Sequence, residues 1–244
     1  MKKALSKLQN PALAHGHSMY KGRIPATDYV DMGLPSGTKW AKTDIDVSQP
    51  NGFALSEFQY EKSFFSWGNI VGHNPINETT FEYNFGSVNA QEPWYEGQPY
   101  GDTPGNTLTG NIPVSEEFDA ARAILGYPWR DPTSDDFNEL IADSIYIDAT
   151  GTEIPAENIN KLVTVNNIIG IYLQSKTNGN RLFLSASGSG VGSSWSGRST
   201  YGFYWSSSHG SSREGRRLRF YNGGVSPQNY SDRCDGFAIR AVTK

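Results

Sequence analysis

The sequence predicts an α+β fold in which antiparallel sheets dominate, joined by two short helices and long loops. Aromatic residues make up 13% of the 244 residues, together with 26 Gly and 13 Pro, and this composition suits short strands and turns better than long helices. Apolar and polar residues alternate through the C-terminal half, whereas helix-start signals are few and local. An all-helical bundle is therefore excluded, and the length fits one large domain with a short appendage.

The first 27 residues predict an arm that precedes the folded domain. Residues 1–27 carry basic residues, Pro and the pair His15 and His17, with little alternation of apolar and polar positions. We expect this arm to serve attachment or oligomerisation and residues 28–244 to form the domain. The two histidines could chelate a metal, but carboxylate and thiol partners with ligand spacing are missing nearby, which favours surface histidines.

The domain is expected to open with a hairpin from Tyr29 to Ala41, because two strand-like pieces flank a Pro-Ser-Gly turn. The next feature along the chain is an aromatic cluster over residues 64–68. Residues 73–110 are rich in Asn, Gly, Pro and Tyr without a clear period. This stretch predicts a long insertion that wraps the surface.

Two short helices are expected in the middle of the chain. Ser115 is the predicted N-cap of the first, which ends at Gly126 and has acidic residues in its first turn. Thr133 is the predicted N-cap of the second, residues 134–141, with Asp136 as the reciprocal partner of a capping box. Between the helices, Trp129 and Arg130 are interpreted as structural.

The C-terminal half predicts strands over residues 162–165, 168–173 and 181–184, with a tight hairpin turn at residues 178–180. The Gly/Ser tract of residues 185–200 resembles a flexible linker. Trp195 and the aromatic residues that follow argue instead for a loop inside the domain.

The last predicted strands separate a core face from a free face. Leu218 and Phe220 are two residues apart, as are Phe237 and Ile239, so each pair points to one side of its strand. The neighbouring residues are expected to point to the opposite, free side: Arg217, Arg219, Tyr221 and Ala238.

Three separated motifs carry a family resemblance. The C-terminal frame is YWSSS…L-x-F…V-x-P-Q…R-x-x-G-F-x-I-R-x-V. Two motifs precede it in the chain: G-x-x-W-R-x-P-T-x-x-x-F-x-x-L-I and, before that, V-D-M-G-L-P-S-G-T-x-W-A. In combination they resemble the C-type-lectin-fold domains of Bacteroides-type bacteria and their phages, distant relatives of the formylglycine-generating enzymes. The resemblance covers residues 28–242 discontinuously and implies a C-type lectin fold.

The ending most resembles the variable proteins of diversity-generating retroelements, in which mutated adenines randomise surface residues on a fixed scaffold. The resemblance implies a C-terminal variable region of about residues 196–242. It implies a scaffold that includes Trp129, Arg130, Trp205, Leu218, Phe220, Gly236, Phe237 and Ile239. It implies variable, ligand-binding positions at His209, Gly210, Ser211, Ser212, Arg213, Arg216, Arg217, Arg219, Tyr221, Asn222, Gly223, Ser226, Asn229, Tyr230, Ser231, Asp232, Cys234 and Asp235.

Composition agrees with randomised Asn codons. Residues 196–242 contain seven Arg and no Lys, whereas the rest of the chain has four Arg and ten Lys. Randomising the adenines of AAY codons gives NNY codons, which encode no Lys, Glu, Gln, Met or Trp, and between residues 209 and 235 only Glu214 and Gln228 belong to that set. Exposed Arg, Tyr, Ser and Asn also resemble a paratope, whereas a solvated sheet surface is the alternative interpretation.

Enzymatic chemistry is disfavoured. The chain has a single cysteine, Cys234, so the paired-cysteine or copper-thiolate chemistry of the formylglycine-generating relatives cannot be assembled. Cys234 could act as a nucleophile with His209 as base and Asp232 or Asp235 as orienting group, but a chance product of a randomised codon is favoured. No catalytic residue and no cofactor are expected.

A calcium-dependent sugar site is not expected either. Such a site needs clustered carboxylate and amide oxygens. The nearest string is Gln-Glu-Pro-Trp at residues 91–94, in which Trp94 takes the place of a ligand oxygen. The sequence therefore predicts a lectin fold without a metal.

The expected partner is a protein or a glycan on a target cell surface. The formal charge of −4 offers no field for nucleic acid or membranes; we expect no secretion signal and no membrane insertion. Residues 8–14 and 20–22 resemble a leader of phage tail and fibre proteins, which favours a virion tail tip over a cell surface; display on a tail would favour a homotrimer. The alternatives are a fixed-specificity bacterial surface or fimbria-associated module and, less favoured, a degenerate enzyme.

Overall fold

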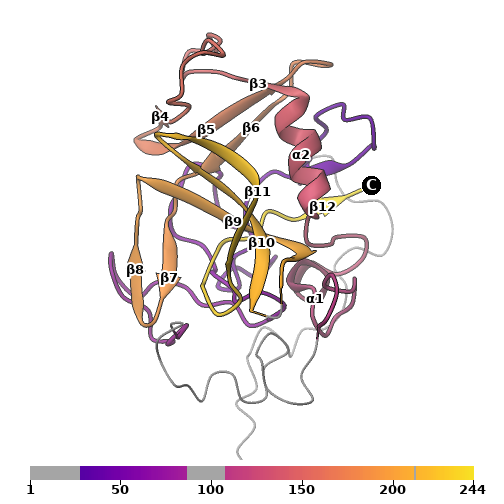
Figure 1. Ribbon diagram of the computed structural model, residues 1–244, viewed down its shortest axis with the longest axis vertical. Helices are drawn as coiled ribbons and strands as arrows, with labels where there is room; N and C mark the ends of the chain where they lie inside the picture. Colours follow the sequence, from indigo (N-terminus) through magenta and orange to yellow (C-terminus); the bar gives the residue numbers. More distant parts are fainter. Residues whose placement is uncertain (1–27, 87–107, 212) are drawn as a thin grey trace, which may run out of the picture.

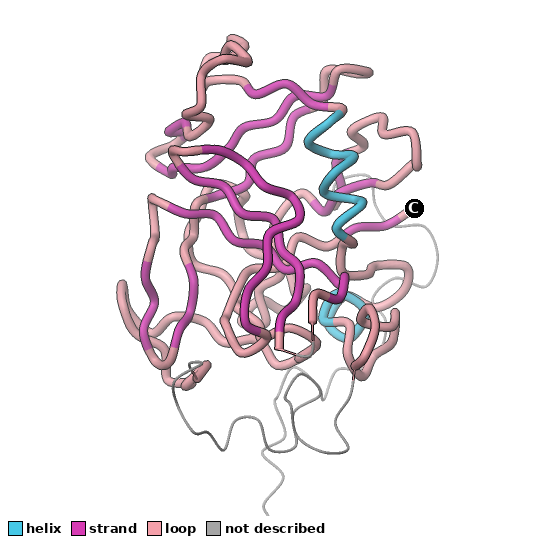
Figure 2. Tube along the Cα trace, viewed as in Figure 1, coloured by secondary structure: helices cyan, strands magenta, loops and turns pink. Residues whose placement is uncertain are grey.

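The computed structural model describes residues 28–86, 108–211 and 213–244, drawn in Figures 1 and 2. These residues form mostly antiparallel sheets with two short helices, which confirms the α+β class. The predicted arm, the Gln-Glu-Pro-Trp string at residues 91–94 and Ser212 lie outside the described residues.

The elements follow one another as β1 (Tyr29–Val30), β2 (Lys39–Ala41), α1 (Ala120–Leu125), α2 (Ser134–Ala142), β3 (Ser144–Tyr146), β4 (Val163–Val165), β5 (Ile168–Ser175), β6 (Arg181–Ser185), β7 (Ser189–Val191), β8 (Ser194–Ser196), β9 (Tyr201–His209), β10 (Glu214–Tyr221), β11 (Gly224–Asp232) and β12 (Val242–Thr243).

The two ends of the described chain meet in one small sheet. β1 pairs with β2, so the predicted opening hairpin is confirmed, and β12 pairs with the other edge of β2. Trp40 lies opposite Val242 in this sheet, and both side chains are fully buried. The last strand thereby closes the fold beside the first two.

A second sheet is built around β5, which pairs with β3 and β4 along one edge and with β6 along the other. The turn between β5 and β6 contains Gly179 at φ +76°, a left-handed conformation that glycine adopts without steric cost. The predicted hairpin at residues 178–180 is therefore confirmed. All three predicted strands are present, and the short strand β3 is an addition to them.

The Gly/Ser tract of residues 185–200 belongs to the domain, as predicted, and it contains a hairpin of its own. β7 pairs with β8, and Trp195 in the middle of β8 is only 3% exposed. Its ring packs against Phe64 and Phe81 at centroid distances of 5.9 and 6.3 Å. The indole N–H donates to the Ser187 carbonyl at 2.5 Å.

The second helix is confirmed and the first begins later than predicted. Thr133 and Asp136 form the expected capping box of α2. The N-cap of α1 is Asp119 rather than Ser115, because the Asp119 carboxylate accepts the N–H of Arg122 at 2.8 Å. The same buried carboxylate accepts the N–H of Asp131 at 3.0 Å. This long-range contact fixes the start of the helix, and a local capping signal could not reveal it.

The C-terminal segment divides the interior into two cores. Phe237, Ile239 and Ala241 enter a first core with Trp67, Trp129 and Trp205, whereas Ala238 and Val242 enter a second core with Leu218 and Phe220. The expectation that Ala238 points to a free face is therefore wrong. The reason is that core lies on both sides of this segment, so alternation along it separates two cores instead of core from solvent.

Within the described ranges, neither helix has the length or the apolar character needed to cross a membrane.

Candidate functional site

Most predicted ligand-binding residues lie on the sheet of β9, β10 and β11. β10 is the central strand and pairs antiparallel with both neighbours, with register shifts near Arg217. Helix α2 packs against this sheet (Figure 1), where its Phe137 and Leu140 join Leu218 and Phe220 in the second core. One face of the sheet is thus committed to the interior.

The opposite face carries aromatic and arginine side chains, and we call Tyr201, Phe203, Arg217, Arg219 and Tyr221 the outer face. Tyr221 lies directly opposite Tyr201, and Arg219 lies opposite Phe203. Directly opposed residues of an antiparallel pair project to the same side of the sheet. The rings of Tyr201 and Phe203 are nearly parallel, with centroids 5.5 Å apart.

Guanidinium groups and rings alternate across the outer face. The Arg219 guanidinium lies 4.4 Å from the ring centroid of Tyr221 and 5.6 Å from that of Tyr201. The Arg217 guanidinium lies 4.2 Å from the Phe203 ring and 4.8 Å from the buried Phe237 ring. Each contact is a cation–π attraction of about 0.5–2 kcal/mol, depending on exposure. The rings therefore hold both arginines in defined positions.

Arg217 is bound by the protein itself. Its Nε donates to the Tyr230 carbonyl at 3.1 Å, and its Nη2 donates to Asn229 Oδ1 at 3.2 Å. Burial lowers the pKa of Arg217 to about 10, although the negative charges of Asp235 and Asp232 act in the opposite direction. Arg217 is thus a largely buried part of the sheet.

Arg219 has no such partners. Within the described residues no hydrogen bond or ion pair reaches its guanidinium, and its Nε is buried without an acceptor. The register places Ser226 of β11 beside Arg219. The hydroxyl groups of Ser226, Tyr201 and Tyr221 are likewise without hydrogen-bond partners in the described part of the chain. This end of the outer face therefore presents one cation and three hydroxyl groups.

The predicted ligand-binding positions do not form one patch. Asn222 and Gly223 make the exposed turn next to Tyr221, whereas His209, Ser211 and Arg213 lie at the other end of β10. A strand of this length spans roughly 25 Å. The predicted residues are thus spread along the whole length of the sheet, and those at its two ends are far apart.

The group at the β9–β10 turn is held together by its own contacts. The Ser211 hydroxyl donates to Glu214 Oε2 at 3.1 Å, and Arg216 Nε donates to the His209 carbonyl at 3.1 Å. The Arg216 guanidinium lies 4.9 Å from the ring of the exposed Tyr230. Burial lowers the pKa of His209, and two arginines, Arg233 and Arg216, lower it further. His209 is therefore neutral at pH 7.

The placement of Cys234 corrects the sequence prediction. Its side chain is 1% exposed, so it is not a surface position available to a ligand. Burial raises the pKa of the thiol, and the charges of Asp235 and Asp232 raise it further, which disfavours the nucleophilic thiolate. The position faces inward because the chain turns at residues 232–235 to enter the core, as the hydrogen bond from Asp235 N–H to the Asp232 carbonyl shows.

Asp235 is half-buried rather than free. Its carboxylate accepts the Ser231 hydroxyl at 2.7 Å. Burial raises the pKa of Asp235 to about 6, and the neighbouring Asp232 adds to this rise. Ser231 and Asp235 are therefore hydrogen-bonded to each other on the side of the sheet that holds Arg217.

The scaffold positions take part in packing. Six of them are buried hydrophobic residues: Trp129, Trp205, Leu218, Phe220, Phe237 and Ile239. Gly236 has no room for a side chain, because a Cβ there would lie 2.5 Å from the Phe85 ring. The Arg130 guanidinium donates to both carboxylate oxygens of Asp136 at 2.7 and 2.9 Å, which confirms its structural role beside the α2 capping box.

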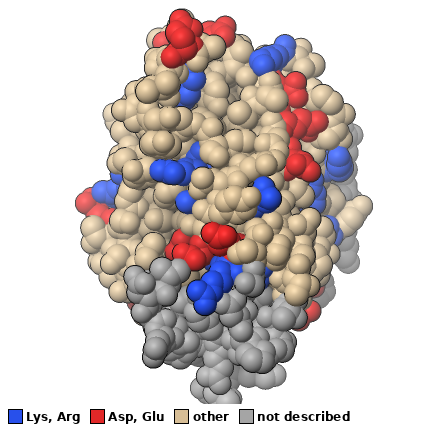
Figure 3. Space-filling view, in the orientation of Figure 1, with Lys and Arg blue, Asp and Glu red and all other residues tan. Residues whose placement is uncertain are grey.

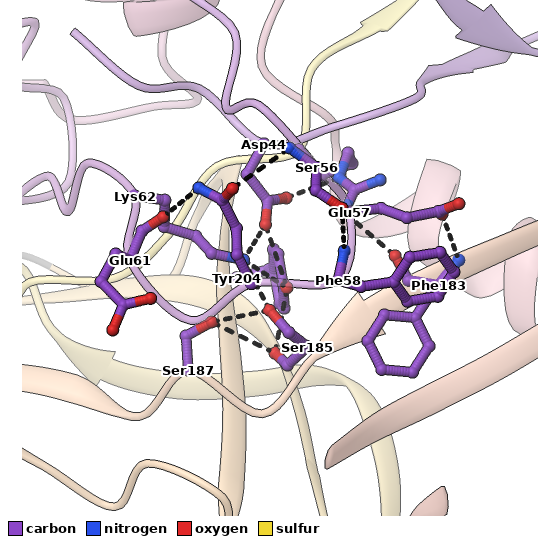
Figure 4. Close-up of polar contacts among 12 residues, drawn as sticks. Asp44, Ser56, Glu57, Phe58, Glu61, Lys62, Phe183, Ser185, Ser187 and Tyr204 are labelled. Atoms are coloured by element: carbon purple, nitrogen blue, oxygen red, sulfur yellow. Dashed lines mark hydrogen bonds and ion pairs between the residues drawn. The ribbon is translucent and has the colours of Figure 1, made fainter. Parts of the chain in front are cut away.

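The most heavily bonded charges lie in a buried cluster that the sequence did not reveal. Lys62 pairs with Asp44 (Figure 4). Arg240 pairs with the same carboxylate, and all three side chains are fully buried or nearly so. Lys62 Nζ also donates to Ser185 Oγ at 2.6 Å, and the Tyr204 hydroxyl donates to the Ser185 carbonyl at 3.0 Å. Burial alone would raise the pKa of Asp44, but the two cations hold it below its ordinary value.

Two outer-face residues were missing from the predicted set, namely Tyr201 and Phe203. The signal that could have found them is the alternation of Tyr201, Phe203 and Trp205, which places three aromatic side chains on one side of β9. Trp205 is buried at one end of this row, and the exposure increases toward Tyr201.

Charged groups are dispersed on the surface over β9, β10 and β11. Figure 3 shows separate Lys and Arg side chains among uncharged ones, with a small acidic group toward the end where the grey residues begin. Across the described ranges, no three His, Cys, Asp or Glu side chains are grouped so that they could hold a metal ion.

No protein-family model, curated protein or solved structure matches the chain.

Proposed function

We propose that this protein is a non-enzymatic binding protein whose outer face contacts a macromolecular ligand. The observation that carries the proposal is the division of one sheet into two faces. Leu218 and Phe220 are fully buried against α2, while Arg219 and Tyr221 between and beside them project outward. Residues that bind a ligand can therefore change without disturbing the core.

This division also supports diversification by a retroelement on a C-type lectin fold. Arg217, Arg219, Tyr221, Asn222 and Gly223 belong to the positions that the family resemblance implies to vary, and none of them is a core residue. The pairing of β12 with β2 agrees with a fold closed by its two ends. Cys234 is excluded from the proposed ligand-binding set because it is buried.

The proposed setting is the tip of a phage tail or a cell surface. Arg and Tyr supply the stiff contact area and forked donors that dominate protein interfaces. Display of several copies would convert weak single contacts into adhesion. The buried Cys234 thiol, with its raised pKa, supports a binding role over thiol chemistry.

The first test is deep sequencing of codons 196–244 across many individuals of the source population. The proposal expects NNY substitutions at Arg217, Arg219 and Tyr221, with Leu218 and Phe220 unchanged as controls on the same strand. Uniform codons would reject diversification and favour a surface module of fixed specificity. Equal variation at buried and outward positions would reject the outer face as the diversified surface.

A further inference from the structure

We propose that Arg219 is the docking point for a carboxylate group on an acidic protein ligand. This inference rests on the proposed function and specifies the partner of the same face. The basis of the inference is that the fold holds Arg219 in a defined position but supplies no carboxylate to pair with its charge.

Orientation comes from two tyrosine rings that lie beside the guanidinium. The guanidinium lies 4.4 Å from Tyr221 and 5.6 Å from Tyr201, and the two rings are inclined by only 27° to each other. Such stacking restrains a side chain that would otherwise have several rotamers. A ligand that binds there therefore loses less conformational entropy in the arginine.

The hydrogen-bonding capacity of Arg219 is unused. A guanidinium has five N–H donors, and within the described residues no acceptor bonds to those of Arg219. Its Nε is shielded from solvent, so an external ligand would meet the two terminal nitrogens, Nη1 and Nη2. A carboxylate would satisfy these best, because its two oxygens can accept from both.

The same molecule contains a completed version of this arrangement at Arg198. Its guanidinium lies 5.2 Å from the Trp195 ring and 5.8 Å from the Tyr60 ring, and it pairs with the Glu78 carboxylate at 3.2 Å. Arg219 has the two aromatic neighbours but lacks the carboxylate. The comparison identifies what the ligand must bring.

The local charge favours an acidic partner. Residues 201–235 contain five Arg and three acidic residues, although the whole chain has 21 basic and 25 acidic residues. Complementary charge raises the association rate and disfavours basic competitors. β10 itself carries three Arg and one Glu, so this strand is positively charged in a chain that is acidic as a whole.

A protein surface fits this site better than a small molecule. Small ligands are usually enclosed in concave pockets, whereas the described residues over β9, β10 and β11 form an open sheet surface in Figure 3. Arg and Tyr are the residues that most often dominate the energy of protein–protein contacts. The free hydroxyl groups of Tyr201, Tyr221 and Ser226 would bind polar groups around the docked carboxylate.

The experiment selects ligands from a random peptide display library with the full chain as bait, followed by affinity measurements on the synthesised peptides. We expect enrichment of Asp and Glu, and about a tenfold or greater loss of affinity for Arg219→Gln. Arg219→Lys should lose part of the affinity, because an ammonium group cannot form the paired hydrogen bonds. Arg198→Gln is the matched control and should leave the affinity unchanged.

Two further arms separate failure of this inference from failure of the proposed function. One arm uses peptides whose binding is lost in the variant Tyr221→Ser. If such peptides contain no Asp or Glu, or if Arg219→Gln does not weaken their binding, the carboxylate docking point is overturned and the binding face is retained. Peptides insensitive to both changes, or the absence of both a selected peptide and polygalacturonate binding, would overturn both proposals. Polygalacturonate binding that depends on Arg219, without any peptide binding, would overturn the assignment to a protein ligand. Thermal unfolding of each variant verifies that the fold is retained.

Discussion

Two arginines of the C-terminal region differ in how far the protein uses their donors. Arg240 is fully buried; its Nε donates to Asp44 Oδ1 at 2.5 Å, and its terminal nitrogens donate to the carbonyls of Ala41, Lys42 and Phe183. Arg219 lies beside the rings of Tyr201 and Tyr221 on the outer face without a described acceptor.

The contrast teaches that residue type alone does not identify a recognition residue. Both side chains are arginines in a segment without lysine, and both are held in place by their surroundings. What separates them is saturation of their hydrogen bonds. A saturated arginine contributes to the fold, whereas an oriented and unsaturated one is available to a partner.

The largest expected effect tests the buried side of this comparison. Arg240→Met leaves Asp44 buried with Lys62 as its remaining charge partner, and breaking a buried ion pair in this way costs about 3–5 kcal/mol. Urea unfolding should show this loss in the free energy of unfolding. The matched change Arg219→Met should cost less, about 2 kcal/mol or below, because it removes two cation–π contacts and no ion pair. Equal losses at both sites would break the comparison.

A second prediction compares the two faces of β10. Leu218→Ala removes a fully buried side chain from the second core and should cost about 2–5 kcal/mol of stability. Ligand affinity per folded molecule should remain nearly unchanged, since Leu218 faces α2. Thermal unfolding and peptide binding, measured on the same preparation, check both statements. A selective loss of affinity without a loss of stability would contradict the assigned faces.

A third prediction uses pH to contrast two carboxylates, Asp235 near Arg217 and Asp44 near Arg240. Asp235 has a pKa raised to about 6, so its protonated form favours the fold and that contribution is lost as pH rises from about 4 through 6. Relative to Asp235→Asn, the wild-type free energy of unfolding should fall over this window.

Asp44 should behave in the opposite way. The two cations lower the pKa of Asp44 by more than burial raises it. Its contribution to the free energy of unfolding is therefore present at neutral pH and is lost only as pH falls below the ordinary pKa of an aspartate. Urea unfolding across the pH series measures both. If the free energy of unfolding of Asp235→Asn depends on pH as strongly as that of the wild type between about pH 4 and 6, the role assigned to Asp235 is contradicted.

The smallest effect is expected at Arg198. Arg198→Gln removes an ion pair with Glu78, whose side chain is 82% exposed, and such surface pairs contribute about 1 kcal/mol or less. Chemical denaturation should detect little change, and rising salt should reduce the difference further. A loss as large as that of Arg240→Met would show that exposure does not distinguish these arginines.

Local sequence signals predicted much of the fold. Alternation located β5, β6 and β10, the Thr133 and Asp136 spacing located the start of α2, and Gly179 located a turn. These features depend on residues close together in the chain, because caps, turns and strand faces are set by neighbours within a few positions.

The candidate site was predicted only in part. Arg219 and Tyr221 were identified because they alternate with Leu218 and Phe220, but Tyr201 and Phe203 of the neighbouring strand were not. Which β9 residues stand beside β10 depends on the register, and the irregular pairing near Arg217 shifts it. Alternation along one strand does not determine the register between two.

The sequence by itself determined the α+β class, the capping of α2 and the outward alternation of β10. Only the tertiary structure decided that Cys234 is buried, that α1 begins after Asp119, and that Arg240 has a carboxylate partner while Arg219 has none. Asp44 and Arg240 are 196 positions apart in the chain. Contacts over such separations form only when the cores pack, so no local pattern can assign them.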